Sequence, residues 1–236
     1  MTLKKFGIPA LPSMFIWLMT PAVSFYLLES LTHDVAENMN GAIIGLNLIF
    51  YYLIYGLLLV ISKRSWISLS LGTFLTMLVG LANYFVLEFR SAPIYPWDLL
   101  SLKTAASVSD NYDYVLEAEV KPLVLGFLIL ILIGLWTRWN LSIKRIRVQA
   151  VLFAAFVAMI GVYTSLVQTP EVHSAVGFYE YLFTPNAFYR NNGFMVSFLS
   201  NMQYLEIDEP DGYNSARVEE ILAPYVEEEK NQSDFQ

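Results

Sequence analysis

Five long apolar segments constrain this chain more than any other feature of its sequence. A helix needs about 20 mostly apolar residues to cross the hydrocarbon core of a bilayer. Segments of roughly this length occupy residues 13–31, 42–61, 66–87, 122–139 and 148–167. Helices of this length that are apolar on every side are typical of membrane spans. The sequence therefore predicts an all-α membrane protein with five transmembrane helices.

The composition agrees with the membrane class. Charged residues make up 15% of the 236 residues, and hydrophobic residues make up 56%. Soluble domains carry about 25% charged residues. The chain has no cysteine, which excludes a disulfide, a thiolate metal site and a cysteine nucleophile. No acidic or basic residue lies deep in any apolar segment, which argues against a proton-driven transporter.

The positions of the basic residues predict the orientation of the chain. Three short segments contain Lys and Arg but no Asp or Glu: they hold Lys4 and Lys5; Lys63 and Arg64; and Arg138, Lys144, Arg145 and Arg147. Cytoplasmic loops are enriched in Lys and Arg. We therefore expect a cytoplasmic N-terminus and, after five crossings, an extracellular C-terminus. The first segment has no small-residue cleavage site after it, so we interpret it as an anchor rather than a signal peptide.

The third and fourth segments are joined by a long outer connection, residues 91–121. Pro93 and Pro96 favour an extended entry, and Asp98 is placed to cap a short amphipathic helix. Tyr95 and Trp97 suit the aromatic belt of a membrane interface. The apolar face of the predicted helix consists of Leu99, Leu102, Ala106 and Val108.

Arg90 begins this connection and has two interpretations. It can pair with Glu88 or extend to the interface, or its planar guanidinium can bind a lipid phosphate. Asp98 likewise is either a helix cap or a polar group facing lipid. The candidate lipid-binding residues are Arg90, Tyr95, Trp97, Asp98 and Arg190. We expect His33 and His173 to be solvated, and the sequence offers no spacing of metal ligands.

The chain beyond the fifth segment divides into two parts. Residues 169–212 carry apolar residues at helical spacing, but Arg190–Gly193 interrupt them, so an extracellular elbow at the interface fits better than a sixth span. Residues 213–236 are acidic and predict a linker helix. The expected domains are thus a transmembrane domain (1–168, including an outer amphipathic segment at 91–121), an elbow (169–212) and a linker (213–236).

Two stretches of these outer segments carry a resemblance to a known family. "RSAPIYPWDLL" resembles the R-x-x-P-x-x-P-x-D-L stretch of lipoteichoic acid synthases and related phosphoglycerol transferases. "NNGFMVSFLSNMQYLEIDEPDGYNSARVEEIL" resembles their G-F-x-x-S-F-L-x-N…P-x-G-Y-S segment, with Asn214 where the family often has Ser. Five spans followed by an outer linker helix are also the layout of that family.

The resemblance implies an extracellular catalytic domain with a sulfatase-like α/β fold, a threonine nucleophile and manganese or magnesium. Such a domain transfers glycerol phosphate from phosphatidylglycerol to a growing polymer. It would begin where this chain ends, at Gln236. We therefore assign no catalytic or metal-binding residue here, and we expect this chain alone to be inactive although the family is one of transferases.

The expected function is a membrane anchor that presents phosphatidylglycerol to the catalytic domain, in the cell membrane of a Gram-positive bacterium. The expected partners are that lipid and that domain, with no nucleic acid, and the oligomeric state is left open. The alternative is a stand-alone multi-pass membrane protein that binds a partner through its acidic outer helix. A reading frame that continues past Gln236 into a metal-binding domain would favour the first interpretation.

Overall fold

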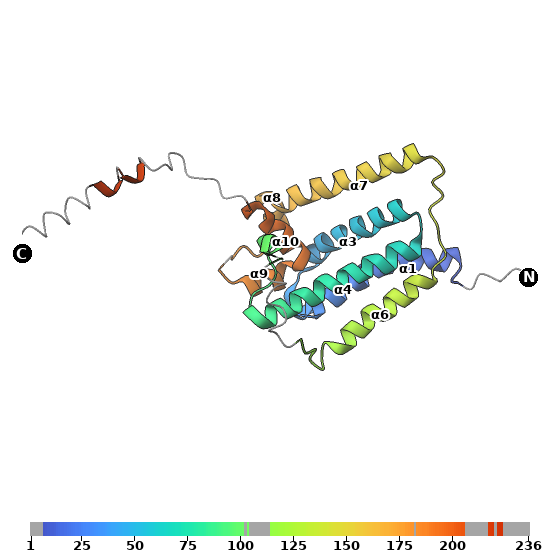
Figure 1. The fold of residues 1–236 in the computed structure, drawn as a ribbon, viewed down its shortest axis with the longest axis horizontal. Helices are drawn as coiled ribbons and strands as arrows, with labels where there is room; N and C mark the ends of the chain where they lie inside the picture. Colours follow the sequence, from blue (N-terminus) through green and yellow to red (C-terminus); the bar gives the residue numbers. More distant parts are fainter. Residues whose placement is uncertain are drawn as a thin grey trace, which may run out of the picture. The chain divides into compact units, whose positions relative to one another are not determined.

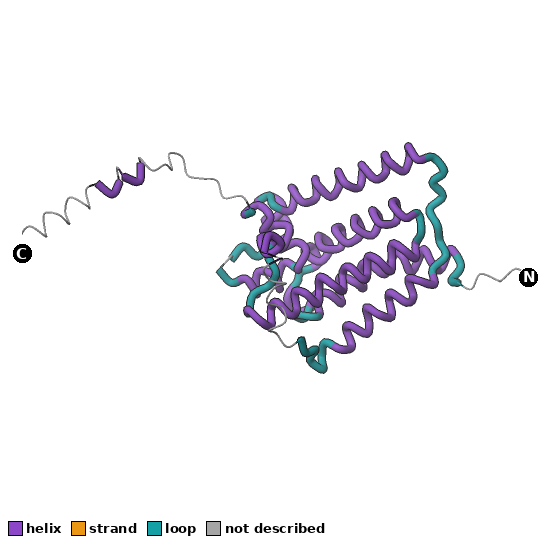
Figure 2. Tube along the Cα trace, viewed as in Figure 1, coloured by secondary structure: helices purple, strands orange, loops and turns teal. Residues whose placement is uncertain are grey.

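The computed structural model describes residues 7–101, 103, 114–181, 183–205, 217–219 and 221–223. These residues form helices and connections, and two isolated β-bridges are the only extended pairings among them. The prediction of an all-α fold is confirmed (Figures 1 and 2). The elements in chain order are α1 (Ala10–Ser30), α2 (Val35–Asn38), α3 (Gly41–Ser62), α4 (Ser65–Arg90), η1 (Pro96–Ser101), α6 (Lys121–Trp136), α7 (Ile146–Val167), α8 (Pro170–Val176), α9 (Pro185–Asn192), α10 (Phe194–Asn201) and η3 (Met202–Tyr204).

Four of the five predicted segments form helices that are long and apolar enough to cross a membrane: α1, α3, α4 and α7. The fifth, α6, has 16 residues, which corresponds to about 24 Å of helix against a hydrocarbon core of about 30 Å. It ends at Trp136 because Thr137 is extended, with ψ 146°, and its hydroxyl donates to the Gly134 carbonyl at 2.8 Å. A crossing by α6 stays a prediction.

Helix α4 lies at the centre of the bundle and contacts α1, α3 and α6. Small residues let these helices approach closely, as is common between membrane helices. A Cβ atom on Gly72 would lie 2.8 Å from the Tyr55 ring of α3, and one on Gly80 would lie 2.8 Å from Leu31 at the end of α1. In the middle of the bundle the Tyr55 hydroxyl donates to Ser24 Oγ at 2.8 Å. Small residues of α4 therefore let α1 and α3 pack closely against it.

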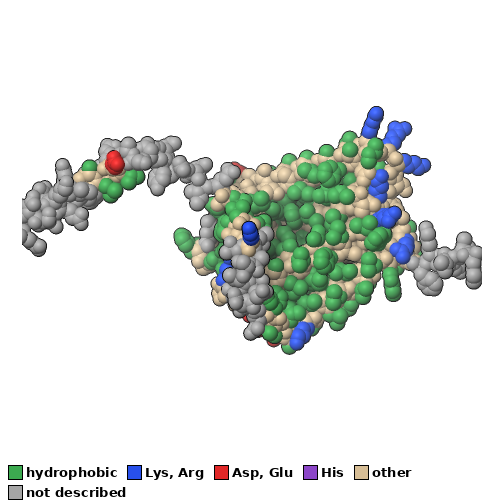
Figure 3. Space-filling view, in the orientation of Figure 1, with side chains coloured by type: hydrophobic (Ala, Val, Ile, Leu, Met, Phe, Trp, Pro, Cys, Tyr) green, Lys and Arg blue, Asp and Glu red, His purple; other side chains and the backbone are tan. Residues whose placement is uncertain are grey.

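One end of the bundle, here called the basic end, gathers two of the predicted basic segments, those with Lys63 and Arg64 and with Arg138–Arg147; Lys4 and Lys5 lie outside the described residues. Ser65 donates from its backbone N–H to the Trp139 carbonyl at 3.0 Å, and Leu141 donates to the Lys63 carbonyl at 2.9 Å. Ile8 donates to the Trp136 carbonyl at 2.8 Å, which brings the start of the described chain to the same place. Figure 3 shows Lys and Arg side chains at this end, beside a face covered by apolar side chains.

The opposite end, here called the elbow end, carries α8, α9 and α10 (Figure 1). The described part of the predicted elbow (169–212) contains α8, α9, α10 and η3, and residues 206–212 lie outside the described residues. Gly193 separates α9 from α10, and its φ of +78° and ψ of 154° favour glycine. The side chains of Phe188, Phe194 and Val196 are each at most 4% exposed, and α10 packs against α3 and α7. The elbow is therefore part of the bundle's packed core.

The chain separates into two compact units, residues 1–203 and 204–236. In the second unit, residues 217–219 and 221–223 are helical. The rest of the predicted linker helix (213–236) lies outside the described residues. The same is true of Leu102, Ala106 and Val108, which belong to the predicted amphipathic face.

Candidate functional site

Four of the five predicted lipid-binding residues lie together at the end of α4. Ser91 takes a left-handed conformation, with φ 56°, and ends the helix so that the chain turns back over Arg90. Arg90 donates from Nη1 to Asp98 Oδ1 at 2.9 Å and from Nη2 to Asp98 Oδ2 at 2.5 Å. The same guanidinium donates to the carbonyls of Ala92, at 3.3 Å, and of Pro93. This two-pronged ion pair, here called the clasp, closes the turn of residues 90–98.

The clasp corrects two interpretations of the sequence. Arg90 pairs with Asp98 across the turn, not with Glu88, two residues earlier on its own helix. Asp98 is also not the cap of a following helix, because η1 already begins at Pro96. Its carboxylate accepts from the Tyr95 backbone N–H at 2.7 Å instead. Burial raises the pKa of Asp98, but the hydrogen bonds from Arg90 and Tyr95 outweigh it and hold that pKa below its ordinary value.

The aromatic residues of this turn stack on one another. The rings of Tyr95 and Trp97 lie 4.4 Å apart at an interplanar angle of 12°. The Arg90 guanidinium lies 5.7 Å from the Tyr95 ring centroid. Trp97 is 39% exposed and Leu100 is 79% exposed, which is the exposure that an interfacial position needs. A guanidinium has five N–H donors, and four donor contacts are already used within the turn. One N–H donor of Arg90 is therefore left for a lipid phosphate.

The elbow packs directly on this turn. The Tyr189 hydroxyl donates to the Ile94 carbonyl at 2.8 Å, and Asn186 Nδ2 donates to the Ser91 carbonyl at 3.1 Å. From the other side, Asn83 of α4 accepts from the Ile94 N–H at 3.0 Å. These hydrogen bonds join the first stretch that carries the family resemblance to α9, 95 positions later in the chain. The second stretch follows directly, and its helix α10 contacts η1.

Arg190, the fifth predicted residue, lies apart from the clasp on α9. It is exposed and makes no ion pair or hydrogen bond with the described part of the chain. It lines a small cavity of about 60 Å³ together with His33, Asn83, Asn186 and Pro93. Two buried atoms at this cavity have no hydrogen-bond partner among the described residues, His33 Nε2 and Asn186 Oδ1. A polar cavity of this size beside an unpaired cation suits a water molecule or a small anionic group.

The expectation of two solvated histidines is wrong. The His33 side chain is 4% exposed and the His173 side chain is 12% exposed. His173 stacks on Phe178 at 3.9 Å. Burial lowers the pKa of His33 to about 4, with a further lowering by Arg190 and a partial increase from Asp34. His33 is therefore neutral at pH 7.

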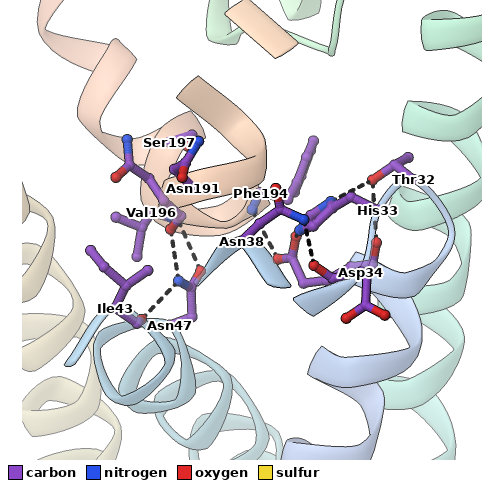
Figure 4. A network of polar contacts seen from close by, with 12 residues as sticks. Thr32, His33, Asp34, Asn38, Ile43, Asn47, Asn191, Phe194, Val196 and Ser197 are labelled. Atoms are coloured by element: carbon purple, nitrogen blue, oxygen red, sulfur yellow. Dashed lines mark hydrogen bonds and ion pairs between the residues drawn. The ribbon is translucent and has the colours of Figure 1, made fainter. Parts of the chain in front are cut away.

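A second polar cluster, which the sequence did not reveal, fastens the elbow to the bundle (Figure 4). Glu29 of α1 is 1% exposed, and its Oε1 accepts from the Phe194 N–H at 2.9 Å. Asn47 of α3 is fully buried; its Oδ1 accepts from the Val196 N–H at 3.3 Å and its Nδ2 donates to the Asn192 carbonyl at 2.8 Å. These side chains pair N–H groups in the first turn of α10, which have no partner inside the helix.

The sequence carried a partial signal for this cluster. Glu29 is an acid in the last turn of an apolar segment, and Asn47 is a polar residue inside one. Asn192 precedes Gly193 and completes the arrangement: its amide accepts from the Tyr179 N–H and donates to the Tyr179 carbonyl, both at 2.8 Å. Neither Glu29 nor Asn47 reveals its partner in the sequence, because the partners are backbone groups about 150 residues away.

The described residues include no group of three or more His, Asp or Glu side chains placed to hold a metal ion. The manganese or magnesium predicted above belongs to a domain that this chain was not expected to contain, and it stays a prediction. The fold and the site of the described residues together define an all-helical bundle with four helices long and apolar enough to span a membrane and with short helices packed on its elbow end. No family model, curated protein or solved structure matches this chain.

Proposed function

We propose that this chain is the membrane module of a phosphoglycerol transferase related to the lipoteichoic acid synthases. In this proposal α1, α3, α4, α6 and α7 all cross the membrane, the basic end faces the cytoplasm, and the elbow end faces outward. The module anchors a catalytic domain and presents phosphatidylglycerol to it. Residues 204–236 lead toward that domain.

One observation carries the proposal. Two stretches resemble the family, residues 90–100 and 191–222. They meet at the elbow end, where α10 of the second stretch contacts η1 of the first and where Tyr95 packs against the apolar core that contains Phe194. Motifs that share a function are expected to meet in space, whereas two chance similarities have no reason to do so. The exposed aromatic and apolar residues of the turn, Trp97, Leu99 and Leu100, suit a position at the lipid interface.

The charges favour Arg190 over Arg90 as the contact for the lipid phosphate. Arg90 is held by Asp98 and by two carbonyls, so its role is to shape the turn. Arg190 is unpaired in the described chain and lies beside the cavity that contains His33 Nε2 and Asn186. An exposed charge pair contributes up to about 1 kcal/mol, so loss of Arg190 should weaken phosphatidylglycerol binding by about fivefold.

Native mass spectrometry of the chain, released from nanodiscs of phosphatidylglycerol and phosphatidylcholine, tests lipid presentation. Wild type should retain phosphatidylglycerol, Arg190→Ala should retain less at an unchanged melting temperature, and Arg147→Ala at the basic end serves as the matched control. Equal retention by wild type and Arg190→Ala would refute this placement of the headgroup.

Single-cysteine labelling of intact cells tests the topology separately, since the chain has no native cysteine. Exposed Ser142, at the basic end, should resist an impermeant thiol reagent as Ser142→Cys, and exposed Ser174, on α8, should react as Ser174→Cys. Labelling on the same side of the membrane for both would overturn the five-span arrangement.

A further inference from the structure

An acidic pocket lies at the elbow end, between the end of α1, the end of α4 and the start of α6. Its volume is about 520 Å³. Four carboxylates line it, from the turn after α1, from α4 and from the residues before α6: Asp34, Glu88, Glu117 and Glu119. No Lys or Arg is among the residues that line it in the described part of the chain. The pocket therefore has a negative potential that favours a cation.

A buried polar group lies in the wall of the same pocket without a partner among the described residues. Tyr84 is 4% exposed, and its hydroxyl makes no hydrogen bond with the described residues. His33 also lines the pocket, but its Nε2 lies 3.7 Å from the buried Glu29 Oε2, which is not part of the pocket. Buried polar groups in native proteins are nearly always paired. An unpaired hydroxyl at a pocket lined by carboxylates indicates a ligand with hydrogen-bond donors.

The form of the pocket restricts the class of cation. Within the described residues, no three acidic or histidine side chains approach closely enough to hold a metal ion. The carboxylates are instead distributed around a volume many times that of an ion, and the pocket's remaining wall includes Leu31, Leu87 and Leu123. Such a pocket suits an organic cation that has an apolar portion.

We propose that this pocket binds a primary ammonium group, from an aminophospholipid headgroup or from a free polyamine. A primary ammonium has three N–H donors and no acceptor. It can therefore donate both to the carboxylates and to the Tyr84 hydroxyl oxygen, which a quaternary ammonium cannot do. The proposal rests on a pocket that Arg190 does not line, so it stands or falls independently of the phosphatidylglycerol contact.

Two binding measurements at pH 7.5 distinguish the sources of the ammonium. In the first, the chain is released from nanodiscs of mixed phosphatidylethanolamine and phosphatidylcholine, and its retained lipids are identified by native mass spectrometry. In the second, spermidine is titrated calorimetrically into the chain in phosphatidylcholine nanodiscs. Preference for phosphatidylethanolamine alone identifies a lipid ligand, binding of spermidine alone identifies a polyamine, and both together identify the ammonium group as the feature recognised.

Variants connect the binding to the pocket. The double variant Glu117→Gln/Glu119→Gln should weaken binding by about fivefold or more, while Glu171→Gln on α8, outside the pocket, should leave it unchanged. Tyr84→Phe removes an unpaired hydroxyl, so the melting temperature without ligand should stay the same or rise while ammonium binding weakens. A structural role for that hydroxyl would instead lower the melting temperature.

Three results would overturn the proposal. The first is equal retention of the two lipids together with no binding of spermidine. The second is unchanged ammonium binding in both the double glutamine variant and Tyr84→Phe. The third is displacement of bound ammonium by magnesium chloride, added at the same concentration as the ammonium ligand, when sodium chloride of the same ionic strength displaces none. That result would assign the pocket to a divalent metal ion.

Discussion

Replacement of Asn47 by Leu should detach the elbow from the bundle. Asn47 is fully buried and serves two backbone groups of the elbow, the Val196 N–H at 3.3 Å and the Asn192 carbonyl at 2.8 Å. Leucine keeps a similar volume but leaves both groups buried without a partner. A buried unpaired group destabilises a protein by about 1–3 kcal/mol, and hydrogen bonds between membrane helices contribute about 0.6 kcal/mol on average.

These two figures set the expected magnitude. The loss of two hydrogen bonds between helices gives the lower value, about 1 kcal/mol. Two unpaired groups at the low end of their range give about 2 kcal/mol. At 2 kcal/mol the population of detached elbow rises about 30-fold. Leucine also removes the bond from Asn47 Nδ2 to the Ile43 carbonyl, but that carbonyl keeps a backbone partner in the helix, so the groups left unpaired are those of the elbow.

A thiol-accessibility assay measures this population directly. Ser200 on α10 is 3% exposed, so a Ser200→Cys variant of this cysteine-free chain should react slowly with a thiol reagent. Adding Asn47→Leu should accelerate labelling by about 10- to 30-fold under conditions in which detachment limits the reaction. Asn191→Ala is the matched control, since Asn191 donates only to Ala187 of its own helix. Unchanged labelling with Asn47→Leu would refute the view that Asn47 fastens α10.

Three further predictions concern the same end of the molecule. Gly193→Ala should destabilise the fold by about 1–3 kcal/mol, because φ is +78° and the added Cβ would lie 2.5 Å from Asn47 Nδ2. Gly161→Ala in α7, where nothing lies within 4 Å of the added Cβ, should be neutral in the same thermal melts. Equal melting temperatures for the two variants would contradict this prediction. Asp98→Asn should lower the melting temperature at pH 7. Because the folded-state pKa of Asp98 is held below 3.8, its stabilisation is present above 3.8 and is lost as the pH falls through the folded value, so the wild type should lose its advantage over Asp98→Asn in acid; a constant difference would argue against the clasp. The pKa of His33 is lowered to about 4, so the unfolded chain binds more protons between pH 4 and 6.5 and stability should rise with pH across that interval; His33→Asn should flatten the slope, and an identical slope in both proteins would show that other groups cause it.

The helical architecture was predictable because apolar composition over 20 residues is a local property of the sequence. The ends of α1, α3, α4 and α7 fall within about three residues of the predicted limits. The fourth segment ends at Trp136, also three residues from its predicted limit, because the Thr137 side chain bonds back to Gly134 and the chain extends there. Hydropathy does not register that bond.

The site was predictable only in its membership. Prolines and an aromatic pair identified the 90–98 turn as unusual, and Arg90, Tyr95, Trp97 and Asp98 do lie together in it. Their mutual geometry was not predictable, since Arg90 has Glu88 and Asp98 within reach in sequence and only the left-handed Ser91 brings the second one over it. The burial of Glu29 and His33 depends on helices that are distant in sequence, and no local pattern announces it.

The attachment of the elbow by Glu29 and Asn47 imposes an order on biosynthesis. Their partners at residues 194 and 196 follow them by 165 and 149 residues, which at 5–20 residues per second corresponds to roughly 7 to 33 s of translation. During that interval the Glu29 carboxyl and the Asn47 amide lack the backbone N–H groups of Phe194 and Val196 that they later accept from. A chain whose synthesis stops before Gly193 thus exposes the polar side chains of Glu29 and Asn47 at the elbow end. A membrane chaperone or protease that recognises this polar surface would distinguish an unfinished chain from a finished one.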